Sequence, residues 1–271
     1  MCSTIEQLLA QIEEILDEGL DASATERILR LLGAPAFPVA VLEEMLLYEE
    51  HLPKAADLPL TPGTRFLHFL WDALDRTPMG LATNFALPFR RMIGERLFKR
   101  CGRNLIADES IRFNFGHNIE VGDDVFVGRG VFLDGKGGIF LGNHVELAED
   151  VVIFTHSHSE SVHSERRYGR VVLEDYVKIH ADAMILPGVT VGQEAIVGAK
   201  SLVGKDVPAG MLVVGSPARV SRERRNGGRH GHDLEHYWLR DGAFQLCQHP
   251  VWAGSCAGAD PQTPETPETP D

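Results

Sequence analysis

The sequence predicts a mainly β protein, with a parallel β-helix at its centre, a helical segment before it and a polar tail after it. Two observations predict the β-helix. From 173 to 203 an aliphatic residue returns at every sixth position, namely Leu173, Ile179, Ile185, Val191, Val197 and Val203, and glycine follows each of the last three. Helices repeat near 3.6 residues and strands near 2, so neither produces this period. A period of six is typical of a solenoid in which each unit is a short strand plus a corner, and three units make one coil.

The same period extends upstream in two further blocks. The first contains Phe115, Val121, Val127 and Leu133, and the second, after a slip of two residues, contains Leu141, Leu147 and Ile153. Twenty positions separate Ile153 from Leu173, which predicts one unit plus an inserted loop, with three irregular units as the alternative. An ordinary β-sandwich of short strands is disfavoured, because it does not explain three in-phase blocks.

Residues 1–100 are predicted to form a helical N-terminal domain. Apolar residues from Ile5 to Leu16 follow helical spacing, and a capping box at Ser23–Glu26 predicts a second helix that ends at Gly33. A third helix is expected around Val39–Glu50, and another apolar face spans Phe66–Leu74. The apolar and basic stretch Pro88–Arg103 predicts an amphipathic helix that caps the first coil, because an open solenoid end leaves backbone groups unpaired. A nucleic-acid or membrane face is the alternative for that stretch.

The expected β-helix domain covers residues 101–222, and a flexible tail is expected over 223–271. Pro261–Asp271 repeats Pro, Thr and Glu, a composition typical of disorder. His230, His232 and His236 lie in an Arg-rich part of this tail, and we expect them to be solvated rather than to bind a metal.

Composition narrows the function classes. With 271 residues, 44% of them hydrophobic, the chain can bury a core, and no apolar run reaches the roughly 18 residues of a membrane span. The first residues show no signal peptide, so a cytoplasmic location is expected. Four scattered cysteines without a CxxC pair argue against a zinc ribbon and a disulfide framework. A net charge of −13 disfavours nucleic acid as a partner.

Basic residues nevertheless gather at the end of the repeats. The cluster consists of Lys200, Lys205, Arg219, Arg222, Arg224 and Arg225. It suits a small anionic ligand, and a solvated basic face is the alternative.

Five segments together carry a family resemblance: Phe154–His158, Leu186–Gly192, Ile196–Val203, Lys205–Gly210 and Gly215–Val220. Over about residues 105–225 the chain resembles the hexapeptide-repeat O-acyltransferases, and it looks most similar to their maltose/galactoside acetyltransferase branch. The resemblance implies a left-handed parallel β-helix, a homotrimer with active sites between adjacent subunits, and acetyl-CoA or a related acyl-CoA as donor. It also implies a histidine that acts as general base, and no metal is expected.

His158 and His156 are the candidate bases. An imidazole that titrates near neutrality suits proton removal from a hydroxyl. The resemblance favours His158, at the end of a coil just before the extended loop, and strand alternation puts His156 on the same face. Glu160 and Glu165 are candidates to orient the base, although neither matches the family position cleanly. Asp134 falls near the family's acceptor-binding aspartate, and a simple turn aspartate before Gly135 is the alternative.

The resemblance also assigns the donor side. Ala199, Gly204 and Lys205 match positions that contact the pantetheine and phosphates, and Arg219 and Arg222 match two basic residues that reach the adenosine 3′-phosphate. Arg and Lys are the expected partners of such anions. The chain departs from the branch at Lys178, where an aromatic residue is usual, and at Val127–Gly130, where an acceptor-binding Asn is missing. The second departure weakens a galactoside or maltose assignment.

The predicted function is acetyl-CoA-dependent O-acetylation of a hydroxyl on a sugar or related small molecule. A serine O-acetyltransferase is the nearest alternative. A metal enzyme like the γ-class carbonic anhydrases is another, because His158 and His163 have its spacing of five and neutral imidazole binds zinc. A non-catalytic structural trimer is the third.

Overall fold

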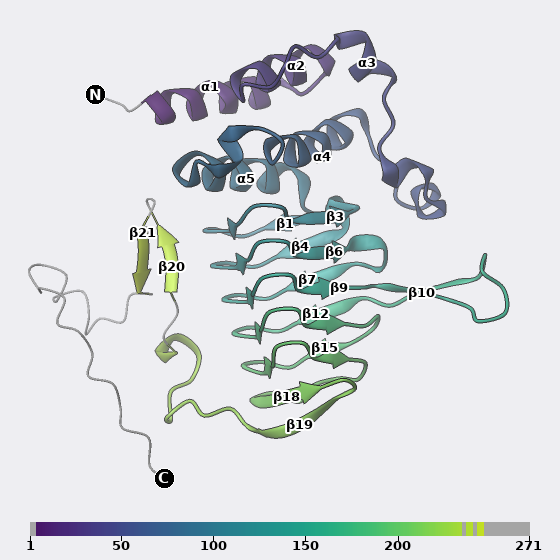
Figure 1. The fold of residues 1–271 in the computed structure, drawn as a ribbon, viewed down its shortest axis with the longest axis vertical. Coiled ribbons are helices and arrows are strands. Elements are labelled where there is room, and N and C mark those ends of the chain that lie inside the picture. Colours follow the sequence, from purple (N-terminus) through teal and green to yellow (C-terminus); the bar gives the residue numbers. More distant parts are fainter. Residues whose placement is uncertain (1–3, 235–236, 241–242, 247–271) are drawn as a thin grey trace, which may run out of the picture.

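The computed structural model describes residues 4–234, 237–240 and 243–246. In Figure 1 a layer of helices covers one end of a stack of short strands. The helical layer contains α1 (Thr4–Glu18), α2 (Ala22–Leu31), α3 (Val39–Glu44), η1 (Tyr48–His51), η2 (Pro53–Ala56), α4 (Pro62–Leu74), η3 (Pro78–Leu81) and α5 (Thr83–Leu97). None of the described helices combines the length and hydrophobicity needed to cross a bilayer.

Two helix boundaries differ from the sequence-based expectation. Asp21 caps α2, because its carboxylate accepts a hydrogen bond from the Ala24 backbone N–H at 2.7 Å, so Ser23 lies inside the helix. The third helix ends at Glu44, and the short helices η1 and η2 follow it instead of a continuation to residue 50. These two 3-10 helices form part of the cavity described below.

The strands stack into three parallel sheets, here named A, B and C. Sheet A contains β1 (Arg100–Cys101), β4 (Ile119–Val121), β7 (Ile139–Leu141), β12 (Val171–Leu173) and β15 (Thr190–Val191). Sheet B contains β2 (Ile106–Ala107), β5 (Phe126–Val127), β8 (Glu146–Leu147), β13 (Lys178–Ile179), β16 (Ile196–Val197) and β18 (Met211–Gly215), and the antiparallel strand β19 (Ala218–Glu223) closes it. Sheet C contains β3 (Arg112–Asn114), β6 (Phe132–Asp134), β9 (Val152–Ile153), β14 (Met184–Ile185) and β17 (Leu202–Val203).

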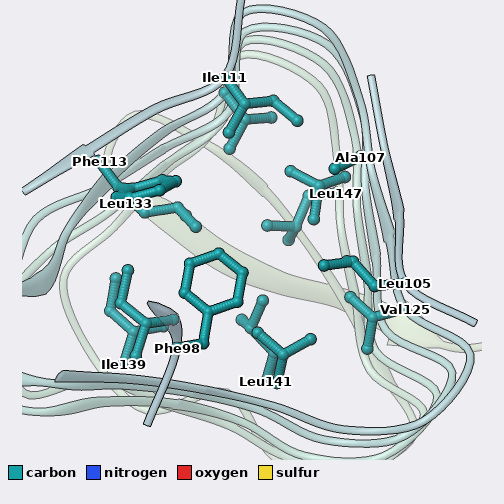
Figure 2. Close-up of a cluster of buried hydrophobic side chains, with 14 of the residues drawn as sticks. Phe98, Leu105, Ala107, Ile111, Phe113, Val125, Leu133, Ile139, Leu141 and Leu147 are labelled. Atoms are coloured by element: carbon teal, nitrogen blue, oxygen red, sulfur yellow. The ribbon is translucent and has the colours of Figure 1, made fainter. Parts of the chain in front are cut away.

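This arrangement confirms the predicted parallel β-solenoid. Each coil passes once through sheets A, B and C, and the aliphatic residue of each strand packs on those of the coils above and below, as Ile179 pairs with Leu147 and Val197. Figure 2 shows such buried side chains, among them Leu133, Leu141 and Leu147, filling a triangular cross-section. The left hand of the coil stays a prediction from the family resemblance.

The register of the first coil corrects the sequence analysis. Phe113, not Phe115, pairs with Leu133, and Phe115 sits at the following corner with a φ of 49°. The corner between sheets C and A, here called the C–A corner, therefore holds two extra residues in both of the first two coils. Phe113 and Val121 are eight positions apart, as are Leu133 and Leu141. Short 3-10 turns, η4 (Gly116–Asn118) and η5 (Gly135–Gly137), accommodate the extra residues.

The C–A corner of the third coil carries the interruption of the period. There β10 (His156–His158) and β11 (Arg166–Tyr168) form an antiparallel hairpin that projects from the stack in Figure 1. The gap between Ile153 and Leu173 is thus one unit plus an insertion, as predicted.

The helices and the coils share one buried cluster. It runs from Ile12 and Trp71 through the solenoid to Val213. Trp71 donates its indole N–H to the backbone carbonyl of Ile111 at 2.9 Å, and Arg90, buried on α5, forms an ion pair with Asp75. The helical layer therefore caps the first coil, and the division of the chain at residue 100 into separate domains stays a prediction.

The described start of the tail packs against the solenoid. The Arg224 side chain donates to the backbone carbonyls of Tyr176 and Glu194, and His230 Nδ1 lies 2.8 Å from Glu194 Oε2. His232 Nδ1 is 3.0 Å from the Tyr176 hydroxyl. These two histidines therefore contact the coils rather than solvent alone. His236 and the segment 261–271 lie outside the described residues.

Candidate active site

The C–A corner builds the candidate active site by stacking polar residues from successive coils. Asn114 pairs in register with Asp134, and Thr155 and His156 follow in the next coil. Gly135 permits this close stacking, because a Cβ there would lie 2.3 Å from the Asn114 carbonyl oxygen. Chemistry-bearing side chains some twenty positions apart in sequence thus become neighbours in space.

His156 and Asp134 form a hydrogen-bonded pair. His156 Nδ1 lies 2.5 Å from Asp134 Oδ2, and the Asp134 side chain is fully buried whereas His156 is 18% exposed. Because an ionised carboxylate only accepts, Nδ1 carries the proton and Nε2 is left as the basic nitrogen. Within the described residues Nε2 has no hydrogen-bond partner. This is the geometry of a general base held by an acid.

Both oxygens of the Asp134 carboxylate accept further hydrogen bonds. Lys136 Nζ donates to Oδ1 at 2.9 Å, and the Thr155 backbone N–H donates to Oδ2 at 3.2 Å. Burial opposes ionisation, but the hydrogen bonds from Lys136 and His156 outweigh it and lower the pKa of Asp134. Asp134 is therefore an ionised acid bound by protein groups. Its predicted role as an acceptor-binding residue stays a prediction.

His158 has different surroundings. It is exposed on β10, its Nδ1 lies 3.1 Å from the His163 backbone carbonyl oxygen, and its ring stacks on that of His163 with centroids 4.3 Å apart. Among the described residues no carboxylate binds either ring, and Glu160 and Glu165 are exposed in the hairpin loop without a side-chain hydrogen bond to a histidine. The acid that pairs with a histidine thus comes from the preceding coil, 22 positions upstream of His156.

A cavity of about 770 Å³ opens onto His156. One wall is formed by Phe132 of sheet C together with Lys136 and Phe154 of the C–A corner. A second wall is the hairpin β10–β11. A third wall is segment 46–54, which contains η1 and lies on the same side of the stack as the hairpin in Figure 1. Lys54 Nζ sits 4.4 Å from the centre of the Tyr168 ring and so connects the second and third walls.

Sequence reasoning missed segment 46–54 as part of the site. Glu49 is buried there, and burial raises its pKa. The Asn114 amide, oriented to satisfy both neighbours, donates to Glu49 Oε1 at 3.0 Å and accepts from Lys136 Nζ at 3.2 Å. A run of acids beside apolar residues, Tyr48 to Glu50, was the available signal, but nothing local linked it to residues 65 positions away.

The predicted donor residues lie at two edges of sheet C. Gly204 and Lys205 follow β17 at the C–A corner, two coils beyond Phe154, a rise of about 10 Å at the usual strand spacing. Ala199 follows β16 at the opposite edge of the sheet, and Arg219 on β19 pairs with Val214, which packs against Gly198. Arg222 lies further along β19. All five are exposed, and none lines the 770 Å³ cavity.

The described residues contain no group of three metal-ligating side chains. His158 and His163, the candidate zinc pair, are stacked on each other instead of converging on a point. Cys101 is a free, half-buried thiol, and burial raises its pKa to about 12. The other three cysteines lie outside the described residues.

Comparison with known proteins shows which proteins this chain is similar to. Residues 170–205 match the model of the bacterial transferase hexapeptide family. A galactoside O-acetyltransferase of Lactococcus lactis is 31% identical over 48% of this chain and 65% of that enzyme, slightly under two thirds of its length. A serine acetyltransferase of Bacillus licheniformis is 33% identical over 55% of this chain and 68% of that enzyme.

A solved structure agrees. It is a hexapeptide-repeat acetyltransferase of Vibrio cholerae in complex with acetyl coenzyme A, 27% identical, which superposes with a TM-score of 0.53 over 68% of this chain and 98% of that one. The repeats, the three-sheet solenoid and these relatives lead to one conclusion: the chain belongs to the hexapeptide-repeat acetyltransferase family.

Proposed function

We propose that this protein transfers an acetyl group from acetyl-CoA to a hydroxyl of a sugar or a related small molecule. The His156–Asp134 pair carries the proposal, because His156 lines the cavity and supplies a base where an acceptor can bind. The name of the Lactococcus lactis relative supports a sugar hydroxyl as acceptor, and the acetyl-CoA bound to the Vibrio cholerae protein supports the donor.

The reaction needs one base and one leaving group. Asp134 holds Nδ1–H of His156, so Nε2 removes the acceptor hydroxyl proton as the oxygen attacks the thioester carbonyl carbon. The tetrahedral intermediate collapses, the C–S bond breaks, and the imidazolium returns its proton to the CoA sulfur. The products are the acetyl ester and free CoA. General base catalysis of this kind contributes roughly 10²- to 10⁴-fold in rate.

The donor is proposed to lie along sheet C. Gly204 and Lys205 continue the column of Phe154, so a pantetheine chain along this corner would carry the thioester toward His156. Ala199, at the opposite edge of sheet C, would contact a pantetheine bound between this subunit and its neighbour in the proposed trimer, and Arg219 and Arg222 would bind the 3′-phosphate. Exposed cations suit a phosphate-rich ligand on a chain of net charge −13.

The proposal favours His156 over His158 as base. His156 has a buried acid partner, a free Nε2 and a place in the cavity wall, whereas His158 contacts a backbone carbonyl. We further propose a homotrimer, in keeping with the family. Size-exclusion chromatography with light scattering is expected to give three chains per particle, and a monomer at working concentrations would contradict it.

The test is release of free thiol from acetyl-CoA in the presence of sugars, alcohols and L-serine. Thiol release that depends on a sugar or alcohol, with the ester found by mass spectrometry, is expected. The serine acetyltransferase relative keeps L-serine as the second candidate acceptor. Turnover with L-serine alone would transfer the assignment to that reaction. Failure to bind acetyl-CoA in calorimetry would contradict both.

A further inference from the structure

Lys136 stands out because it shares the Asp134 carboxylate with His156. It lies on η5, its side chain is only 11% exposed, and Nζ contacts Oδ1 while His156 Nδ1 contacts Oδ2. One buried negative charge thus faces two groups that can be positive. Resemblance to the family assigned no role to this position.

The second contact of Lys136 restrains its position. The Asn114 amide accepts from Nζ and donates to Glu49, so a chain of hydrogen bonds runs from η1 through Asn114 and Lys136 to Asp134. Because Nζ contacts both Asn114 and Asp134, the position of the Lys136 charge is fixed. The N-terminal segment, to which the sequence assigned no role, supplies the far end of this chain.

The fixed charge has an electrostatic consequence. Without Lys136, the buried Asp134 carboxylate would favour a second proton on His156, because an imidazolium would be its only cationic partner. An imidazolium cannot act as a base. With Lys136 in place, the carboxylate is already neutralised, and a further positive charge on His156 meets a like charge nearby.

We propose that Lys136 is a positioning residue: its charge neutralises the Asp134 carboxylate, which then favours an added proton on His156 less strongly than it would without Lys136. The inference rests on the proposed function, in that it concerns the protonation of the proposed base. Lys136 acts through Asp134 and is not itself assigned contact with a substrate.

The other charges on the helical side of the site are largely paired. Asp72 on α4 forms an ion pair with Arg112 at 3.0 Å, and Lys54 pairs with Asp57 at 2.9 Å. His68 on α4 is buried, and burial lowers its pKa to about 3, so it is neutral. Glu49 reaches the pair only through Asn114 and Lys136.

Besides His156, the hairpin contributes four titratable groups to the lining of the cavity. His158 stands with its ring 5.3 Å from that of His156 and stacks on His163, and the Tyr168 ring lies 6.4 Å from His156. Arg166 donates to the Ser164 carbonyl. Lys136 is thus the cation that directly contacts Asp134 alongside His156 in the described structure.

The decisive experiment compares Lys136→Gln with Lys136→Arg. Glutamine can still donate to Asp134 but carries no charge, whereas arginine keeps the charge. For Lys136→Gln, we expect the acid limb of the kcat/KM profile to move roughly one pH unit upward, the low end of shifts caused by a neighbouring charge. Activity should recover at high pH. Lys136→Arg should keep the limb within a few tenths of a unit of the parent.

A second readout does not need activity. The ring signals of labelled histidine, with His156 identified by its loss in His156→Asn, report the pH at which this ring takes up a proton. The midpoint should rise by the same amount in Lys136→Gln. If it moves while the parent acetylates no acceptor, the proposed function fails and the inference about Lys136 stands.

An unchanged midpoint, or a loss of kcat/KM that is equal at every pH, would overturn the inference and assign Lys136 to binding or structure. If Lys136→Gln does not fold by circular dichroism, Lys136→Met tests the same charge with a stem of similar length. The midpoint is expected to rise there too.

Discussion

The coils before and after the hairpin follow one plan but differ at one corner. From Leu173 to Val203 the steps from strand to strand are all six residues, and the C–A corner between Ile185 and Val191 is a plain turn. In the three coils nearest the helices the same corner is longer, and it holds Asn114, Asp134 with Lys136, and the hairpin with His156. The regular coils thus provide the stack, and the irregular corner provides the chemistry.

The difference between the regular coils and the irregular C–A corner predicts that a substitution at Asp134 has the largest effect on activity. Asp134→Asn should lower kcat/KM by about 10²- to 10⁴-fold, because an amide no longer fixes the His156 tautomer. Steady-state thiol release measures the change. Asp182→Asn is the matched control, since Asp182 also pairs with a lysine, Lys200, but on the exposed surface of a regular coil. An equal loss in both variants would contradict the comparison.

Two core substitutions test the same comparison between the regular coils and the extended C–A corner. Ile179→Ala in a regular coil and Ile139→Ala beside the C–A corner should each lower the free energy of unfolding by about 2–5 kcal/mol, because both side chains are fully buried. Only Ile139→Ala should also lower kcat, by roughly ten-fold or more, because it loosens the turn that holds Lys136. Urea unfolding and thiol release measure the two effects. A comparable loss of kcat in Ile179→Ala would show that the regular coils also shape the site.

A substitution in the proposed acetyl-CoA site is expected to have a smaller effect. Lys205→Ala should raise KM for acetyl-CoA about ten-fold with kcat nearly unchanged, because a charge-assisted contact to a phosphate contributes roughly 1.5–3 kcal/mol. Lys99→Ala removes an exposed lysine that pairs with Glu120 at the opposite end of the stack, and serves as control. No change in the KM for acetyl-CoA of Lys205→Ala would remove this residue from the donor site.

The smallest expected effect concerns a hydrogen bond between α4 and the extended C–A corner of the first coil. The Gly116 backbone N–H donates to His68 Nε2 at 3.1 Å, and burial lowers the pKa of His68 to about 3. Since the unfolded chain protonates His68 near pH 6.5 and the folded chain does not, stability falls as pH drops below 6.5. The loss is about 1.4 kcal/mol per pH unit.

His68→Gln lacks this titration, so its unfolding free energy should fall less steeply than that of the parent between pH 6.5 and 5. Urea unfolding at several pH values measures the slopes. Parallel slopes in the two proteins would show that His68 does not titrate as described.

Much of the fold follows from the sequence because the period is local and strong. Each unit from Leu173 to Val203 repeats the same small set of residues, so the strands fall where the period predicts. The first coil was misregistered, with Phe115 in place of Phe113, because both are phenylalanines and the longer corner was not visible without its neighbour in space.

The candidate site was predictable only in part. The hairpin and its two histidines were found from the break in the period, and Asp134 from its position in the preceding coil. Sequence proximity points to Glu160 and Glu165 in the loop as the acid partner, whereas stacking of the coils brings His156 against Asp134, 22 positions upstream. Glu49 and Lys136 were missed for the same reason: their contact passes through Asn114 and links three separate segments.

The central claim is that His156, held by Asp134 at the extended corner, is the base. The most direct test measures kcat/KM for thiol release in His156→Ala and His158→Ala, with acetyl-CoA binding by calorimetry as the control for folding. The account predicts that His156→Ala keeps acetyl-CoA binding and loses transfer by about 10²-fold or more, while His158→Ala stays within a few-fold of the parent. Loss of transfer in His158→Ala with His156→Ala still active would contradict it.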